Sequence, residues 1–289
     1  FDQLVGQAAS LRDAGIEMVW ASQIFSYDAL TALAVIGREV DGIGLGTAVV
    51  PTFPRHPVVL ADQALTVQAA TGGRLTLGVG LSHQVVVENV FGQSFDRPAR
   101  HMREYLSVLM PLLHGEQVGF QGETLRATTF GPLDVRAAAP RVLVAALGST
   151  MLGLAGRLAD GTVTWMTGPS TIEVHIVPTI RRAAAEAGRP EPSIGVGLPV
   201  CVTADVEGAR TRASDVFAIY GHLPSYRAML DREGVAGPAD VSVVGSETEV
   251  RAVLERLAAV GVTEFCGAPF GSPSEISDSV ALLAGLAGR

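Results

Sequence analysis

The chain of 289 residues contains no lysine: all 21 of its basic residues are arginine. This absence excludes every mechanism that depends on a lysine amine, including Schiff-base aldolases, pyridoxal-phosphate enzymes and the Walker phosphate loop. It also restricts how a phosphate could be held, because arginine and the backbone N–H groups at helix N-termini remain as its donors.

The sequence also contains few cysteines, and its net charge is negative. Cys201 and Cys266 are the only cysteines and form no CxxC pair, so neither a disulfide framework nor a zinc site is indicated. The 29 acidic residues give a net charge of −8, which argues against nucleic-acid and anionic-membrane partners, since both need a dense basic face. We expect a small-molecule substrate.

No segment has the length of a membrane span. The longest uncharged stretch, residues 142–156, has 15 residues, whereas roughly 20 are needed to cross a bilayer. No secretory pattern opens the chain. We therefore expect a cytoplasmic protein.

Seven apolar runs lack the polar alternation of a half-exposed sheet and predict fully buried strands. They cover residues 16–21, 43–50, 75–80, 142–147, 162–166, 194–202 and 262–267. Helical spacing between the runs predicts helices over residues 28–40, 57–70, 98–113, 150–158, 171–187, 206–220 and 247–260. Such alternation is typical of an α/β fold with a parallel sheet.

Seven strands are one short of a closed (β/α)8 TIM barrel. We expect one barrel domain over residues 1–289, with its first strand missing or before Phe1. Insertions are expected after strands 4 and 7, over residues 115–141, with a hairpin-like VGFQGETL, and residues 220–245. An open doubly wound sheet is the alternative, but it usually carries a phosphate loop, which we do not find.

The sequence motifs argue against several enzyme classes. The glycines at 42–46 and 78–80 do not open a helix as GxGxxG requires, so they indicate either close approach of a cofactor ring or strand packing. GxSxG and HExxH patterns are absent, and no two of the six histidines have helical ligand spacing. Hydrolase and metalloenzyme functions, and any metal site, are therefore disfavoured.

His83 is our candidate catalytic residue. It directly follows the run at 75–80, at the carboxyl end of a strand, where barrel active sites lie. A loop histidine bonded to the backbone is the alternative. His101 and His114 are expected at the surface of the helix over 98–113. The arginines at its start, Arg97 and Arg100, could be solvated surface residues, or one of them could steer an anionic cofactor tail.

Other strand ends carry candidate binding residues. Leu147, Gly148 and Ser149 follow a strand and begin a helix, so their N–H groups could bind an anion; an ordinary strand–helix turn is the alternative. Trp20 and Trp165 lie near strand ends and could line a cofactor or belong to the core. Two further groups of candidates are Ser22 and Gln23, for a ring edge, and Tyr220, His222 and Tyr226, for the substrate.

One long segment, GLGTAVVPTFPRHPVVLADQALTVQAATGGRLTLGVGLSH, resembles the luciferase-like monooxygenase superfamily. A second segment, LAGRLADGTVTWMTGP, matches in the same order along the chain. The resemblance covers nearly the whole sequence and implies a (β/α)8 barrel that uses FMN or the deazaflavin coenzyme F420. GLSH and YGHLPSYRAMLDREG resemble the F420-dependent subgroup.

The resemblance implies a non-prolyl cis peptide, Ala48–Val49, behind the deazaflavin ring, and a phosphate at Gly148 and Ser149. The resulting cofactor-binding set is Ser22, Gln23, Thr47, Ala48, Val49, Gly80, Leu81, Ser82, Leu147, Gly148, Ser149 and Trp165. Relatives carry acidic residues or histidine after the second strand and glutamate after the fourth. Here those positions are Ser22, Gln23 and His83.

The resemblance implies an F420-dependent oxidoreductase. It would transfer a hydride between the deazaflavin C5 and a small organic substrate, reducing C=N or C=C or running in reverse. An FMN-dependent monooxygenase and a non-catalytic barrel that binds a flavin or a protein are the alternatives. Dimers are common in the family, so a homodimer is also expected.

Overall fold

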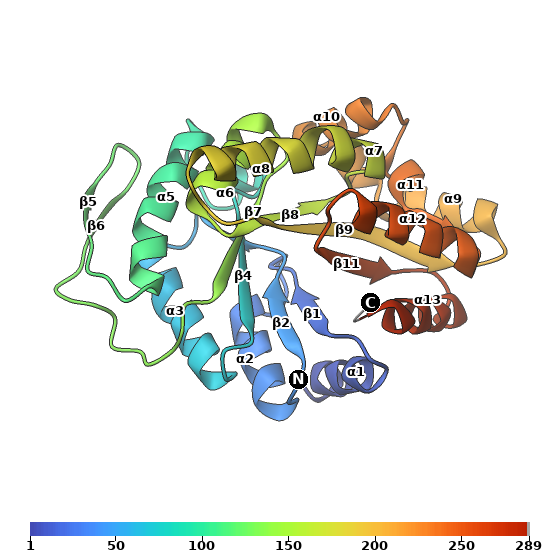
Figure 1. Ribbon diagram of the computed structural model, residues 1–289, viewed down its shortest axis with the longest axis horizontal. Helices are drawn as coiled ribbons and strands as arrows, with labels where there is room; N and C mark the ends of the chain where they lie inside the picture. Colours follow the sequence, from blue (N-terminus) through green and yellow to red (C-terminus); the bar gives the residue numbers. More distant parts are fainter. Residues whose placement is uncertain (288–289) are drawn as a thin grey trace. The chain divides into compact units, whose positions relative to one another are not determined.

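The computed structural model describes residues 1–287 and divides into two compact units (Figure 1). Unit 1 consists of Phe1–Arg12, Glu17–Ala145 and Leu154–Asp160, and unit 2 consists of Asp13–Ile16, Ala146–Gly153 and the chain from Gly161 onward. None of the helices in residues 1–287 combines the length and the apolar character that crossing a membrane requires.

Unit 1 contains a parallel sheet in the order β1, β2, β4, β7, with β3 paired to β4. Its strands are β1 (Met18–Ala21), β2 (Gly44–Thr47), β3 (Val50–Pro51), β4 (Leu75–Gly80) and β7 (Arg141–Ala145). The single strand expected over 43–50 is two strands, because Gly46 pairs with Thr76 but Val50 pairs with Val79. One extra residue on this side of the ladder makes a bulge.

Helices flank the strands of unit 1, and the spacing predicts three of the five, over residues 28–40, 57–70 and 98–113. They are α1 (Asp2–Asp13), α2 (Ala29–Glu39), α3 (Pro57–Ala70), α4 (Gln84–Asn89) and α5 (Pro98–Leu113). Pro57 and Pro98 occupy the first helical turns, where proline costs no hydrogen bond. The first insertion forms the expected hairpin, with β5 (Gly119–Gln121) antiparallel to β6 (Arg126–Thr128). Helix α6 (Ser149–Leu158) has residues in both units.

Unit 2 is built around β9, which pairs in parallel with β8, β10 and β11. These strands are β8 (Gly161–Trp165), β9 (Ser193–Val202), β10 (Val243–Gly245) and β11 (Glu264–Pro269). The helical elements are α7 (Pro169–Thr171), the π-helical turn η1 (Ile172–Ile176), α8 (Val177–Glu186), α9 (Val206–Val216), the 3-10 turn η2 (Ala218–Gly221), α10 (Pro224–Glu233), α11 (Pro238–Val241), α12 (Glu247–Ala259) and α13 (Pro273–Leu286).

The second insertion contains more helix and strand than the sequence predicts. Residues 220–245 contain α10, α11 and β10, none of which was expected. The signals for α10 were present, because Pro224 stands in its first turn and Gly234 follows its end with φ of 79°. Proline at the start and a left-handed glycine at the end are the usual helix boundaries.

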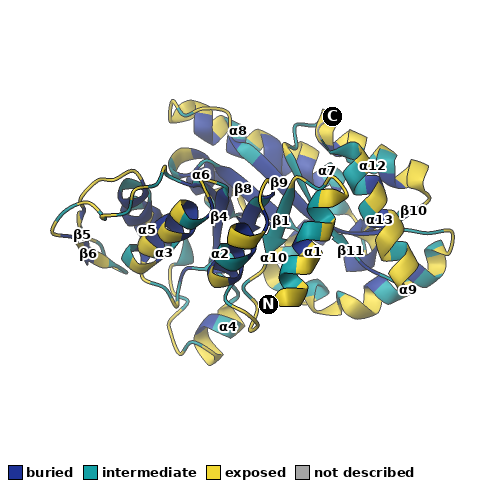
Figure 2. Cartoon of the chain, turned by 90° about the horizontal axis from the view of Figure 1, so that it is seen from below, coloured by how far each residue is buried: buried dark blue, intermediate teal, exposed yellow. Residues whose placement is uncertain are grey.

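Most strands are buried, but two of the seven expected to be fully buried are not. Figure 2 shows β4 in dark blue and β1 and β11 in teal, in agreement with their half-buried residues. Among the described residues, β1 pairs only with β2, and β11 pairs only with β9. A strand with one neighbour leaves one edge without a pairing strand.

Arg74 connects the ends of two helices in unit 1. Its Nε donates to Thr71 O at 2.8 Å, at the end of α3. Its Nη1 donates to Val40 O at 2.9 Å and Ile43 O at 2.8 Å, and Nη2 donates to Gly37 O near the end of α2. One guanidinium thus satisfies carbonyl groups that helix ends leave without partners.

Candidate functional site

The carboxyl ends of β1, β3 and β4 lie at one edge of the unit 1 sheet, because all three strands run in parallel. Two backbone hydrogen bonds join these ends: Ala48 N donates to Ala21 O, and Thr52 N donates to Gly80 O, each at 2.9 Å. Ligand sites in α/β folds form at this edge. The structure therefore brings together the predicted residues after β1, β2 and β4.

The peptide bond between Ala48 and Val49 is cis, which confirms the bond that the family resemblance implied. The glycines of β4 make room for this segment. A Cβ at Gly78 would lie 2.0 Å from Thr47 O, and one at Gly80 would lie 2.7 Å from the Val49 side chain. Of the two interpretations of these glycines, the contacts support strand packing.

Two predicted cofactor residues have side chains that serve the fold. Thr47 is fully buried, and its Oγ1 donates to Gly78 O and accepts from Gly78 N, each at 2.8 Å. Gln23 Oε1 accepts from Ala29 N at 2.7 Å, at the start of α2. Any contact of these two residues with a cofactor stays a prediction.

His83 lies half-buried at the start of α4, directly after Leu81 and Ser82. Its side chain makes no capping hydrogen bond to the helix. Burial lowers the pKa of the His83 imidazole below its usual 6.5, so the ring is neutral at pH 7 and can accept a proton. The expected position at a strand end is confirmed, while the catalytic role stays a prediction.

Three turns that follow strands contain a residue with left-handed backbone conformation. Phe25 (φ 45°), Ser82 (φ 62°) and Met166 (φ 51°) follow β1, β4 and β8, and none is glycine. Such residues cost free energy and are concentrated at functional sites, where the surrounding structure holds them. The positions agree with a site at the strand ends of each unit.

His101 is half-buried on α5, whereas the sequence analysis expected it at the helix surface. Its ring stacks on Phe53 with centroids 4.0 Å apart and planes at 10°. Its Nε2 lies 3.1 Å from the buried Thr52 Oγ1. Burial lowers the pKa of His101 to about 4. The spacing could have indicated this contact, because Tyr105 lies one helical turn after His101 and the two residues share a face of the helix.

This burial predicts a pH dependence of stability. The unfolded chain keeps a pKa of 6.5 at His101 while the folded chain has about 4, so between these values the unfolded state binds more protons and stability falls as pH falls. Thermal unfolding of the parent and of His101→Phe from pH 7.5 to 4 should show the parent losing stability relative to the variant. A constant difference in Tm across this range would contradict the prediction.

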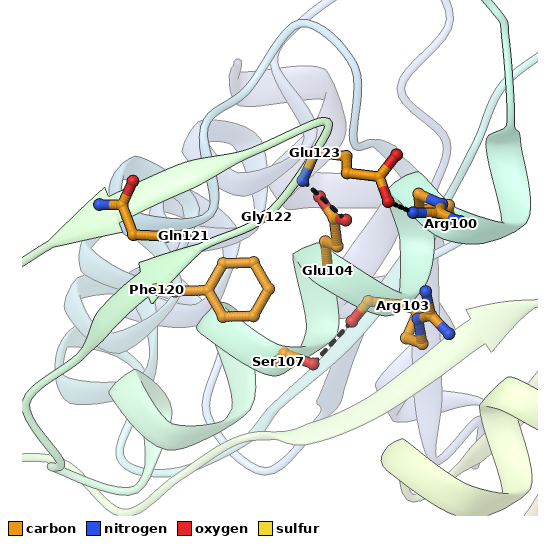
Figure 3. A pocket seen from close by; sticks show the side chains of 8 residues that line it. All are labelled: Arg100, Arg103, Glu104, Ser107, Phe120, Gln121, Gly122 and Glu123. Atoms are coloured by element: carbon orange, nitrogen blue, oxygen red, sulfur yellow. Dashed lines mark hydrogen bonds and ion pairs between the residues drawn. The ribbon is translucent and has the colours of Figure 1, made fainter.

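The polar face of α5 is tied to the hairpin. Glu104 is buried and accepts from the backbone N–H groups of Glu123, Thr124 and Leu125. Hydrogen bonds from Thr124 lower the pKa of Glu104 despite its burial. Figure 3 shows the pocket between α5 and the hairpin, where Arg100 pairs with Glu123.

Arg97 also pairs with Glu123, at 2.5 Å. The same carboxylate therefore pairs with both arginines that had been considered for an anionic tail, and its charge offsets one of their two positive charges. A charge that is already paired attracts a further anion less strongly. The ion pairs support the alternative in which these arginines are surface residues.

In unit 2, the turn at residues 147–149 leads into α6. Gly148 and Ser149 are exposed, and a Cβ at Gly148 would meet nothing within 4 Å. The buried His175 holds the turn, because its Nε2 lies 2.8 Å from Leu147 O. The first N–H groups of a helix with open space before them can receive an anion.

The second insertion brings two predicted substrate residues next to a predicted cofactor residue. The ring centroid of Tyr220 lies 5.9 Å from that of Trp165 and 5.1 Å from that of Tyr226, and both pairs are edge-to-face. The Trp165 Nε1 is buried and makes no hydrogen bond of ordinary geometry to a described residue. Burial raises the pKa of Tyr220, and the neighbouring Trp165 partly offsets this. His222 is exposed, outside these ring contacts.

The family model for luciferase-like monooxygenases matches residues 1–289. The chain therefore belongs to the luciferase-like monooxygenase family, and its relatives are oxidoreductases and monooxygenases. This identifies the protein as an enzyme of that family.

Known proteins of two kinds are similar to the chain. It is 25% identical over 293 residues to 5,10-methylenetetrahydromethanopterin reductase of Methanolobus tindarius, covering 90% of this chain and 88% of the relative. The structure of the coenzyme F420-dependent tetrahydromethanopterin reductase of Methanopyrus kandleri has a TM-score of 0.81 at 21% identity, covering 98% and 93%. An FMN complex of a Baeyer–Villiger monooxygenase from Pseudomonas putida has a TM-score of 0.74 at 16% identity, covering 98% and 91%.

These likenesses establish the fold class. The structural neighbours are TIM-barrel enzymes of the luciferase-like type, and each covers nearly the whole chain. The α/β-barrel prediction is therefore confirmed, and the doubly wound sheet is set aside.

Proposed function

We propose that the chain is a coenzyme F420-dependent oxidoreductase. It would transfer a hydride between the deazaflavin C5 and a small organic substrate, in C=N or C=C reduction or the reverse. The observation that carries the proposal is His83, which lies half-buried in the turn after β4, at the edge of the sheet where the strands end. Similarity to a coenzyme F420-dependent reductase supports it.

Each unit, taken by itself, contains residues that fit one part of the cofactor. In unit 1, Ala48 and Val49 are half-buried, so their cis peptide can back a ring. In unit 2, the open space at Gly148 can admit a phosphate.

When bound, the deazaflavin supplies the hydride chemistry, and the protein supplies binding, orientation and proton transfer. His83 is neutral at pH 7, because burial lowers its pKa, and can accept the proton that a substrate releases on oxidation. In the reducing direction the same residue would donate a proton, and it would do so better at lower pH. Tyr220 and Tyr226 would contact the substrate.

Cofactor titration tests the proposal. Purified protein is titrated with oxidised F420 and, separately, with FMN, and binding is followed by cofactor fluorescence. We expect tight F420 binding and turnover of reduced F420 with at least one of a panel of cyclic imines and enones. Tight FMN binding with flavin-dependent oxygen consumption would replace the proposal with a monooxygenase. No hydride exchange with either cofactor would indicate a non-catalytic barrel.

A substitution at Gly148 tests the phosphate site. Gly148→Val is expected to raise the Kd for F420 about tenfold, equivalent to 1.4 kcal/mol, because the new side chain would fill the space before α6. Stability should not change, since a Cβ there meets nothing within 4 Å. Gly119→Val, at another glycine with open space on the hairpin, is the matched control. A Kd within twofold of the parent would reject Gly148 as the phosphate site.

A further inference from the structure

Helix α5 packs two aromatic side chains against residues 52–55, the segment that follows β3. His101 and Tyr105 stand one turn apart on this helix. The His101 ring lies on Phe53 and beside the Thr52 hydroxyl, while the Tyr105 hydroxyl donates to Arg55 O at 2.9 Å. One helix face therefore holds residues 52–55 at two points.

The held segment is connected directly to the candidate site. Thr52 follows β3 and is 1% exposed, and its N–H donates to Gly80 O, the last carbonyl of β4. Gly80 is three residues before His83, and Thr52 is three residues after the cis bond at Ala48–Val49. A shift of Thr52 would therefore move both the cis peptide and His83.

A third strand end is linked to the same segment. The Arg55 guanidinium pairs with Asp28, which caps α2 at the end of the loop after β1. Hydrogen bonds from Thr31 and the positive charge of Arg55 lower the pKa of Asp28, despite its partial burial. Residues 52–55 thus contact elements that follow β1 and β4 as well as α5.

We infer that His101 is a positioning residue, whose imidazole at Thr52 Oγ1 and Phe53 sets the position of the ends of β3 and β4, and with them the cis peptide and His83. A histidine fits this role because the flat ring stacks on Phe53 while a ring nitrogen meets the buried hydroxyl. Its pKa of about 4 keeps the ring neutral at physiological pH. The catalytic consequence rests on the proposed function.

The test uses His101→Phe, which keeps the ring stack and removes the nitrogen at Thr52. Thr52→Val removes the same contact from the other side. Turnover of reduced F420 should fall about tenfold in each variant, while KM and the Kd for F420 stay within about threefold, because small displacements of reacting groups mainly slow the chemical step. The double variant should be no slower than either single variant, since both remove one interaction.

Hydrogen exchange supplies a readout that needs no cofactor. Amides in peptides covering residues 48–53 and 79–86 should exchange faster in His101→Phe than in the parent. His114→Phe, at the exposed end of the same helix, is the control and should match the parent. His101→Gln, which can restore a polar group near Thr52, should recover part of both effects.

Two outcomes separate this inference from the proposed function. Unchanged exchange in both peptides of His101→Phe would overturn the positioning role, whichever cofactor the protein uses. A parent protein without F420 turnover would overturn the proposed function, and faster exchange in the variant would still support the structural role of His101. Additive losses in the double variant would also overturn the inference.

Discussion

Replacing His83 with glutamine is expected to lower turnover of reduced F420 by about 10²- to 10⁴-fold, the usual contribution of a general acid or base. The residue lies at the end of β4, half-buried and without a capping hydrogen bond to α4. Glutamine retains polar atoms but cannot exchange a proton near neutral pH. The KM should change much less than kcat, because the lost interaction acts on the chemical step.

The pH profile gives a second measurement of the same role. Since burial places the pKa of His83 below 6.5, kcat/KM for substrate oxidation should fall as pH falls below that pKa, where the base becomes protonated. The glutamine variant should lack this limb. A primary isotope effect with substrate deuterated at the carbon that gives up the hydride establishes that hydride transfer limits the rate. Turnover within a few-fold of the parent under these conditions would exclude His83 as the acid or base.

Replacing Arg74 with alanine is expected to lower the free energy of unfolding by about 3 kcal/mol or more, because hydrogen bonds to a charged group contribute about 1.5–3 kcal/mol each and are not fully additive. The variant would leave carbonyls of Gly37, Val40, Ile43 and Thr71 without their donor. Urea unfolding followed by circular dichroism measures the change.

Lysine should not restore this stability. Arg74→Lys keeps the charge but replaces a planar five-donor group by a single ammonium, which cannot reach all of these carbonyls at once. Arg38→Ala, at an exposed arginine of α2, is the matched control and should lie within about 0.5 kcal/mol of the parent. An Arg74→Ala variant as stable as this control would show that the carbonyls find other donors.

Much of the fold could be predicted because it rests on local patterns. Apolar runs and helical spacing identified seven strands and seven helices, and Pro57 and Pro98 marked two helix starts correctly. Elements of the second insertion were missed, although Pro224 and Gly234 bounded α10. A short strand such as β10 has no distinctive pattern of its own and forms through pairing with β9.

The candidate site was only partly predictable. Position at a strand end indicated His83, and the motif order along the chain indicated the cis bond at Ala48–Val49. The role of Thr47 in holding β4 and the burial of His101 were not visible. Each depends on a partner distant in sequence: Thr47 bonds Gly78, and His101 meets Thr52.

The residue types limit the possible chemistry before any folding is considered: without lysine, no lysine amine can act, and a phosphate must be held by arginine, backbone N–H groups or neutral side-chain donors. The sequence also determines the order of strands and helices, since hydrophobic spacing is local. Which of the arginines and helix N-termini are available to a ligand depends on packing. Packing pairs Arg97 and Arg100 with Glu123 and leaves the N-terminus of α6 open at Gly148. The physical reason is that charge pairing and burial depend on residues that packing brings together from distant parts of the chain.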